Sequence, residues 1–247
     1  MPSLLLLHGF TGAPSSWGAV VESLPAGTRS EAPWLVGHGR PPAAPGVTSF
    51  EQEVERLAGW LAQDTRWVLA GYSLGARLGL ALLQSHPSHF AAAVLVSGRI
   101  GLDSEAERAA RALQDEKWCE LLAEAGLAAF VERWAAQPLF ASQATLSEAD
   151  QTAELGRRLA HDPRGLIQSL RSTGLARMPS SAGKLGNVSA KVELLAGARD
   201  LPFCHHARAI VRELPHARFT SVPGAGHNLL LERPQAVAQA IARGLQS

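Results

Sequence analysis

The sequence predicts an α/β protein with a mostly parallel sheet and helices on both of its faces. Two observations carry this prediction. Short apolar segments of strand length alternate with helical patterns in residues 1–100 and again in residues 187–247, whereas residues 101–186 are rich in Ala, Glu, Arg and Leu and hold no convincing strand. We therefore expect an α/β core, residues 1–100 and 187–247, interrupted by a helical cap insertion, residues 101–186.

The expected strands are short, continuous apolar runs, as in strands that are buried on both faces of a parallel sheet. They lie at residues 3–7, 67–70, 91–96, 192–195 and 218–222, with a weaker candidate at residues 29–32. The insertion follows the strand that ends at Ser97.

The expected core helices show apolar residues three and four apart. Trp17, Val20, Val21 and Leu24 mark the first, with Ser15 or Ser16 as its cap. The others span residues 50–61, 74–86 and 205–214, and a final helix opens at Pro234. Three glycines and three prolines make residues 37–46 a loop.

Bulk composition limits the function. The chain has 247 residues, 46% hydrophobic and 18% charged, which fits a folded domain and not a disordered segment. A net charge of +1 gives no global basic field for nucleic acid or an anionic membrane. Cys119 and Cys204 lie far apart and lack metal-type spacing, so we expect two reduced thiols in a cytoplasmic protein.

The remaining composition arguments concern targeting and cofactors. The apolar run at residues 4–7 is too short for a transmembrane helix and lacks a basic region before it, which favours a buried strand over a signal peptide. The chain carries no Gly-x-Gly-x-x-Gly after a strand, no phosphate loop and no metal cluster. We expect no cofactor, a small-molecule substrate, and a monomer or small homo-oligomer.

A Gly-Tyr-Ser-Leu-Gly motif at residues 71–75 carries the first chemical signal. It matches the Gly-x-Ser-x-Gly nucleophile elbow, in which a sharp strand-to-helix turn exposes the serine above the helix N-terminus. The motif alone is weak. Its context strengthens it, because a buried strand precedes Ser73 and an apolar-striped helix follows it. A serine in place of aspartate at position 73 argues against dehalogenase and epoxide hydrolase chemistry.

A nucleophilic serine needs a base and a group that orients that base. Of nine histidines, His227 is the best candidate, since it lies in a loop directly after the last expected strand. His86 and His89 are expected at a helix exit, while His205 and His206 are expected to open a surface helix. Asp200 follows another strand and completes the order Ser, Asp, His that the elbow fold uses.

The loop at residues 8–10 (His-Gly-Phe) follows the first expected strand. We expect the backbone N–H groups of Phe10 and Leu74 to converge on a substrate oxygen as an oxyanion hole. A tight turn that needs Gly9 is compatible with this role.

Arg77 is the first residue that separates one reaction from another. It follows Ser73 by four residues, one helical turn, and so lies on the same side of the helix. An arginine beside the nucleophile suggests a substrate carboxylate. The alternative is an arginine that reaches solvent or braces the insertion.

The chain resembles the 2-succinyl-6-hydroxy-2,4-cyclohexadiene-1-carboxylate synthases of menaquinone biosynthesis, which have the α/β-hydrolase fold. The resemblance covers nearly the whole chain. It is carried by the elbow with Arg77, by His-Gly-Phe and Gly-His-Gly at residues 8–10 and 37–39, by Trp-x-x-Gln-Pro-x-Phe-Ala-Ser at residues 134–142, and by Ala-Gly-His-Asn at residues 225–228.

The resemblance implies a lyase that eliminates pyruvate from 2-succinyl-5-enolpyruvyl-6-hydroxy-3-cyclohexene-1-carboxylate. Ser73 would then act as a base on the carbon next to the succinyl carbonyl, without an acyl-enzyme. The resemblance also implies that Arg77, Arg111 and Arg158 bind carboxylates, and that Tyr72 and Trp134 line the pocket. Alignment around Arg158 is loose because Arg157 is adjacent.

Two alternatives stay open at this point. A small-molecule carboxylesterase would use Ser73 to form an acyl-enzyme, with a burst of product from an activated ester. A binding protein that keeps the scaffold without turnover would leave Ser73 unlabelled by an organophosphate.

Overall fold

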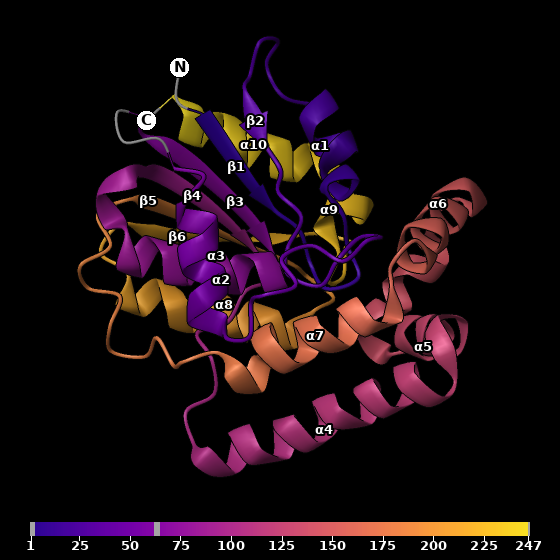
Figure 1. Ribbon diagram of the computed structural model, residues 1–247. Coiled ribbons are helices and arrows are strands. Elements are labelled where there is room, and N and C mark those ends of the chain that lie inside the picture. The colour runs from indigo at the N-terminus through magenta and orange to yellow at the C-terminus, as the bar shows by residue number, and fades with distance from the viewer. Residues whose placement is uncertain (1–2, 62–64, 247) are drawn as a thin grey trace.

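The computed structural model describes residues 3–61 and 65–246, so Met1 and Pro2 at the start of the predicted core lie outside it. Its sheet has six parallel strands in the order β2-β1-β3-β4-β5-β6 (Figure 1). The strands are β1 (Ser3–Leu7), β2 (Ser30–Glu31), β3 (Trp67–Tyr72), β4 (Phe90–Val96), β5 (Lys191–Gly197) and β6 (Ala217–Val222). The predicted α/β class is confirmed, and each predicted strand is present.

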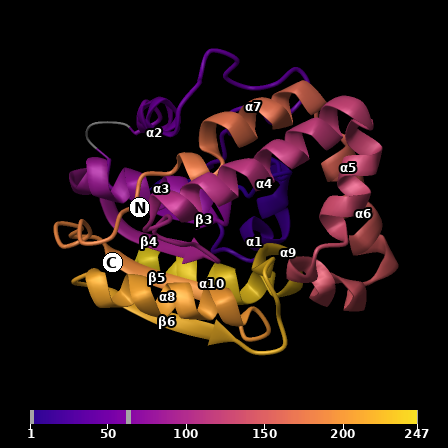
Figure 2. The ribbon, with the colours of Figure 1, turned by 90° about the horizontal axis from the view of Figure 1, so that it is seen from below.

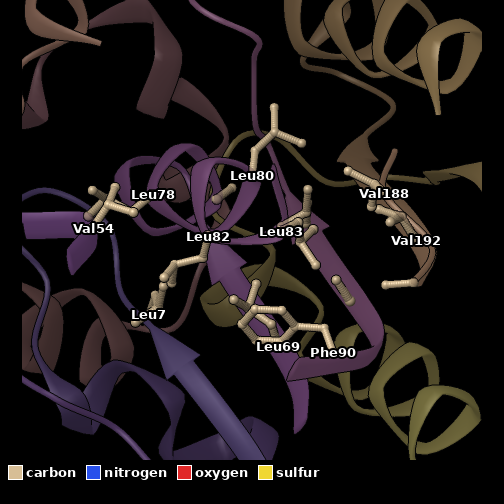
Figure 3. Packing of buried hydrophobic residues seen from close by; sticks show 14 of the residues in the cluster. Leu7, Val54, Leu69, Leu78, Leu80, Leu82, Leu83, Phe90, Val188 and Val192 are labelled. Carbon is tan, nitrogen blue, oxygen red and sulfur yellow. The ribbon is translucent and has the colours of Figure 1, made fainter. Parts of the chain in front are cut away.

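Helices cover both faces of this sheet, because side chains along each buried strand alternate between the two faces. Leu5 and Leu7 of β1 pack with α2 (Phe50–Ala58), α3 (Leu74–Ser85) and α8 (Leu201–Glu213). Leu4 and Leu6 pack on the other side, with α1 (Gly18–Glu22), α9 (Leu229–Glu232) and α10 (Pro234–Leu245). Figure 3 shows the first of these cores, where Leu78 and Leu82 of α3 lie near Leu7 and Val54.

Three helix predictions need correction. The first helix begins as a 3₁₀ turn, η1 (Pro14–Trp17), whose N-cap is Ala13 rather than a serine; Ser16 instead accepts a hydrogen bond from the Ala13 N–H at 3.0 Å. Helix α8 starts at Leu201, four residues early, because Asp200 caps it; His205 and His206 are therefore inside the helix. Helix α2 ends at Ala58. The short helices α9 and η2 (Pro87–His89) were not predicted.

Residues 101–186 contain helices and no strand among the described residues. They are α4 (Glu105–Glu124), α5 (Gly126–Ala135), α6 (Glu148–Leu159) and α7 (Pro163–Thr173), with 3₁₀ turns η3 (Pro138–Thr145) and η4 (Leu175–Arg177). Figures 1 and 2 show α4 and α7 side by side, with α5 and α6 beyond them, to one side of the sheet. Phe130, Leu166 and their neighbours form a separate apolar cluster here. None of the described helices is both long and apolar enough to cross a membrane.

Candidate active site

Ser73 occupies the corner between β3 and α3, and its φ angle is +51°. This is the left-handed region, which side chains other than glycine adopt only at a cost in energy. The two elbow glycines make the corner possible. A Cβ atom on Gly75 would lie 2.0 Å from the Leu7 carbonyl oxygen, and one on Gly71 would lie 2.4 Å from the Gly75 carbonyl oxygen. The motif is therefore required by close backbone contacts.

The three predicted triad side chains meet, although their positions in the sequence are far apart. His227 Nδ1 lies 2.7 Å from Asp200 Oδ2, and His227 Nε2 lies 3.1 Å from Ser73 Oγ. Because an ionised carboxylate can only accept a hydrogen bond, Nδ1 carries the hydrogen, and Nε2 accepts a hydrogen bond from the Ser73 hydroxyl. Both Asp200 and His227 are buried. This arrangement can remove the hydroxyl proton as Ser73 attacks carbon or abstracts a proton.

The backbone around Phe10 and Leu74 is suited to hold an anionic oxygen. Neither N–H group has a hydrogen-bond acceptor within the part of the chain that the structure describes. Leu74 is the first residue of α3, where backbone N–H groups and the helix dipole favour negative charge. The neighbouring N–H of Gly75 donates to the His8 carbonyl oxygen at 3.0 Å, which ties this loop to the elbow.

A cavity of about 340 Å³ opens beside Ser73, within the usual size of small-molecule sites. Its lining combines loops at the carboxyl ends of the strands with helices of residues 101–186. Every predicted site residue lines it except Asp200, which lies behind His227; the lining members are Phe10, Tyr72, Ser73, Leu74, Arg77, Arg111, Trp134, Arg158 and His227. The cavity is thus built from both parts of the chain.

Arg77 and Arg111 lie on the α3 and α4 walls of the cavity. Arg77 Nη1 donates to the Thr173 carbonyl oxygen at 3.0 Å, and no carboxylate among the described residues binds it. Burial and the neighbouring Arg111 lower the pKa of Arg77 to about 9, so it stays charged at neutral pH. Arg111 instead donates to Asp115 Oδ1 at 2.7 Å. Arg77 is therefore a cation that a bound anion would stabilise.

The predicted ambiguity between Arg157 and Arg158 has a structural answer: both line the cavity. They flank Glu154 on α6, with Arg158 Nε 3.1 Å from Glu154 Oε1 and Arg157 Nη2 2.9 Å from Glu154 Oε2. Arg158 is buried, donates also to Gln143 Oε1 at 3.2 Å, and lies over the Phe140 ring. Arg157 and Arg158 therefore both already have a carboxylate partner.

Tyr72 and Trp134 supply an aromatic wall. The Tyr72 ring lies 5.5 Å from the His227 ring, and burial raises the pKa of its phenol, so that group stays protonated. The Trp134 ring lies 5.1 Å from Phe10 and stacks on Phe130. Because Phe10 lies in the loop after β1 and Trp134 lies on α5, these contacts join residues 1–100 to residues 101–186 at the cavity.

Three buried histidines position the loop that carries Phe10, and sequence reasoning gave none of them this role. His38 Nε2 accepts from the Thr11 N–H at 3.2 Å, and His161 Nε2 donates to the Thr11 carbonyl oxygen at 3.1 Å. His8 Nε2 accepts from the Leu35 N–H at 3.2 Å. Burial lowers the pKa of all three, that of His8 to about 3. Their repeated His-Gly context was the available signal for two of them.

Sequence reasoning also missed Ser97, Arg99 and Glu154. Ser97 follows β4 with a φ of +51°, and its hydroxyl donates to the His227 carbonyl oxygen at 2.9 Å. Arg99 and Glu154 line the cavity. The rule that ligands bind at the carboxyl ends of parallel strands would have singled out Ser97 and Arg99, whereas no sequence signal places Glu154 there.

Comparisons with known proteins agree with this architecture. A family model described as the alpha/beta hydrolase family matches residues 4–240. A putative 2-succinyl-6-hydroxy-2,4-cyclohexadiene-1-carboxylate synthase from Bacillus subtilis (strain 168) is 32% identical, with 99% of this chain and 90% of the relative aligned.

Two solved structures are also similar. MenH from S. aureus superposes with a TM-score of 0.94 at 26% identity, covering 99% of this chain and 93% of that one. A thermophilic esterase from Thermogutta terrifontis, solved with malate bound, gives a TM-score of 0.85 at 26% identity, covering 100% and 90%. The chain is therefore an enzyme that belongs to the alpha/beta hydrolase family and resembles its 2-succinyl-6-hydroxy-2,4-cyclohexadiene-1-carboxylate synthases.

Proposed function

We propose that this enzyme is a carbon–oxygen lyase that eliminates pyruvate from 2-succinyl-5-enolpyruvyl-6-hydroxy-3-cyclohexene-1-carboxylate, a step of menaquinone biosynthesis. The observation that carries the proposal is the cavity itself: the hydroxyl–imidazole–carboxylate chain of Ser73, His227 and Asp200 opens into a space lined by arginines. The synthase relatives match nearly the full length of the chain, which supports the same reaction.

In this mechanism Ser73 is a general base. Its hydroxyl proton passes to His227 Nε2, and the serine oxygen takes a proton from the carbon next to the succinyl carbonyl. The electron pair left on that carbon drives the elimination, in which the carbon–oxygen bond to the enolpyruvyl group breaks. The departing enolate takes up a proton and becomes pyruvate. Asp200 stabilises the imidazolium, and the N–H groups of Phe10 and Leu74 bind the enolate oxygen formed from the succinyl carbonyl.

The substrate carboxylates provide the binding energy. Arg77, Arg111 and Arg158 are the proposed carboxylate ligands, with Tyr72 and Trp134 against the ring. Residues 101–186 act as a cap over a core of residues 1–100 and 187–247. Two buried thiols, Cys119 and Cys204, agree with a reducing, cytoplasmic setting.

The second candidate is a small-molecule carboxylesterase. It is favoured by the esterase relative and by the unoccupied N–H groups of Phe10 and Leu74, which suit a tetrahedral intermediate equally well. The two reactions differ in what Ser73 does. The esterase forms a covalent acyl-enzyme, and the lyase does not.

One experiment separates the two reactions. Pyruvate release from the cyclohexene substrate is followed with lactate dehydrogenase and NADH, in parallel with hydrolysis of a series of nitrophenyl esters. We expect pyruvate release that Ser73→Ala abolishes, and no mass increase on Ser73 during turnover. Absence of pyruvate, together with an ester burst and an acylated Ser73, would refute the lyase and establish the esterase.

A further inference from the structure

Arg99 lies at the carboxyl end of the sheet, three residues after β4, and lines the same cavity as Ser73. Its Nε and Nη2 groups both donate to the Gly101 carbonyl oxygen, at 3.2 and 3.1 Å. One carbonyl therefore holds one edge of the guanidinium. No hydrogen bond among the described residues uses Nη1, so that group and the outer N–H of Nη2 are available to a ligand.

The acidic residues around Arg99 are engaged elsewhere. Asp103 accepts from the Ser180 hydroxyl at 3.4 Å, and Glu107 accepts from the Ser104 N–H at 3.2 Å as part of a helix cap. Both side chains are exposed, which weakens their attraction to Arg99. Neither forms an ion pair with it. Arg99 thus reaches the cavity without a carboxylate partner.

Arg99, Arg77 and Arg111 form one positively charged group, which we call the arginine end of the cavity. Burial lowers the pKa of Arg99, and repulsion from Arg111 lowers it further. Burial and repulsion from Arg111 and Arg99 likewise lower the pKa of Arg77. Asp115 hydrogen-bonds to Arg111, and it attracts Arg77 without a hydrogen bond. The exposed Asp103 and Glu107 attract Arg99 without forming an ion pair with it. Like charges held together in a partly buried cavity are stabilised when an anion binds between them.

We propose that Arg99 is a further substrate-binding residue, which together with Arg77 and Arg111 makes the arginine end specific for substrates that carry two acidic groups. One guanidinium suffices for one carboxylate, and a second unpaired guanidinium beside it provides a separate site for another. This inference rests on the proposed function, because it names the chemistry that the same cavity recognises. It assigns to Arg99 the selection of dianions over monoanions.

The test uses succinate and its monoamide, succinamate, as probes, with affinities measured by titration calorimetry on the full chain. We expect wild-type protein to bind succinate about tenfold or more tightly than succinamate. Arg99→Gln is expected to weaken succinate binding about tenfold while changing succinamate binding less than about twofold. Arg99→Lys keeps the charge without the planar fork, and we expect it to recover part of the difference.

Arg108→Gln is the matched control. Arg108 also donates to a backbone carbonyl, that of Leu102 at 3.0 Å, but it does not line the cavity. Its succinate affinity is expected to equal that of the wild type. Equal succinate affinities in wild type and Arg99→Gln, or no preference for succinate in the wild type, would overturn the inference. Binding needs no turnover, so a failure of pyruvate release would remove the lyase proposal and leave this measurement valid.

Discussion

The arginines at the two ends of the cavity differ in whether an internal carboxylate already binds them. At the arginine end, Arg77 and Arg99 donate to backbone carbonyl oxygens, and Arg111 donates to the carboxylate of Asp115. At the α6 end, Arg157 and Arg158 share the carboxylate of Glu154. Arg77 and Arg99 can therefore bind a substrate carboxylate directly. Arg157 and Arg158 must first separate from Glu154. A lining arginine is thus not by itself a binding site; its existing partners decide.

The largest expected effect concerns the predicted triad, which lies between the two ends of the cavity. Ser73→Ala and His227→Ala are each expected to reduce kcat for pyruvate release by about 10⁴-fold or more, since the triad acts as a unit. Stopped assays with lactate dehydrogenase measure this loss. Ser85→Ala, at the far end of α3, is the control and keeps full activity. Activity within tenfold of wild type in either triad variant would contradict the mechanism.

The second prediction concerns the contact between residues 101–186 and residues 1–100, where His161 lies beside His8 and His38. The folded protein keeps these imidazoles neutral because burial lowers their pKa, whereas the unfolded chain takes up protons below a pH of about 6.5. Stability is therefore full above that pH and is lost as the pH falls. These three groups give a slope of at most about 4 kcal/mol per pH unit, and His206, whose pKa is also lowered by burial, adds to it.

Urea unfolding between pH 7.5 and pH 5 measures that slope. His38→Gln is expected to reduce it, and His205→Gln, which replaces an exposed imidazole, is expected to leave it unchanged. Acidic groups with lowered pKa values contribute only at more acidic pH. A flat stability profile between pH 6.5 and pH 5 would show that these histidines are not kept neutral by the fold.

The third prediction compares the two ends directly. Arg77→Gln is expected to lower kcat/KM for pyruvate release by about 10- to 100-fold, the value of a charge-assisted hydrogen bond that displaces no internal carboxylate. Arg158→Gln is expected to cost less than about tenfold, because Glu154 already holds that arginine. Hydrolysis of an uncharged nitrophenyl ester serves as the control and is expected to change little in either variant. A larger loss for Arg158→Gln would reverse the comparison.

The smallest effect is a gain. Glu154→Gln removes the carboxylate that competes with a substrate for Arg158, and we expect the cyclohexene substrate to bind a few-fold more tightly. Titration calorimetry with Ser73→Ala in the background, which prevents turnover, measures the affinity. Glu148→Gln, on the same helix but outside the cavity lining, is the matched control. Weaker binding in Glu154→Gln would mean that Glu154 orients Arg158 for the substrate instead of competing with it.

The sequence predicted most of the core because its signals are local. Five apolar strands, the elbow at residues 71–75 and the candidate residues Asp200 and His227 all follow from short motifs and from chain order. Helix starts were less predictable. Helix α8 begins at Leu201 because Asp200, a residue of the site, also caps it through the Phe203 N–H at 3.4 Å. Asp200 thus both caps helix α8 and contacts His227.

Sequence alone determined the fold class and predicted Ser73, Asp200 and His227 as candidate residues for the chemistry, because apolar periodicity and close-packed glycines leave few alternatives for a chain of this composition. Only the tertiary structure decided which charges are free. Glu154 and Arg158 are one helical turn apart, so their pairing agrees with the sequence, yet nothing in the sequence shows that the pair faces Ser73. His161 contacts Gly39 and Thr11 from a distant segment, and such contacts exist only once the chain has folded.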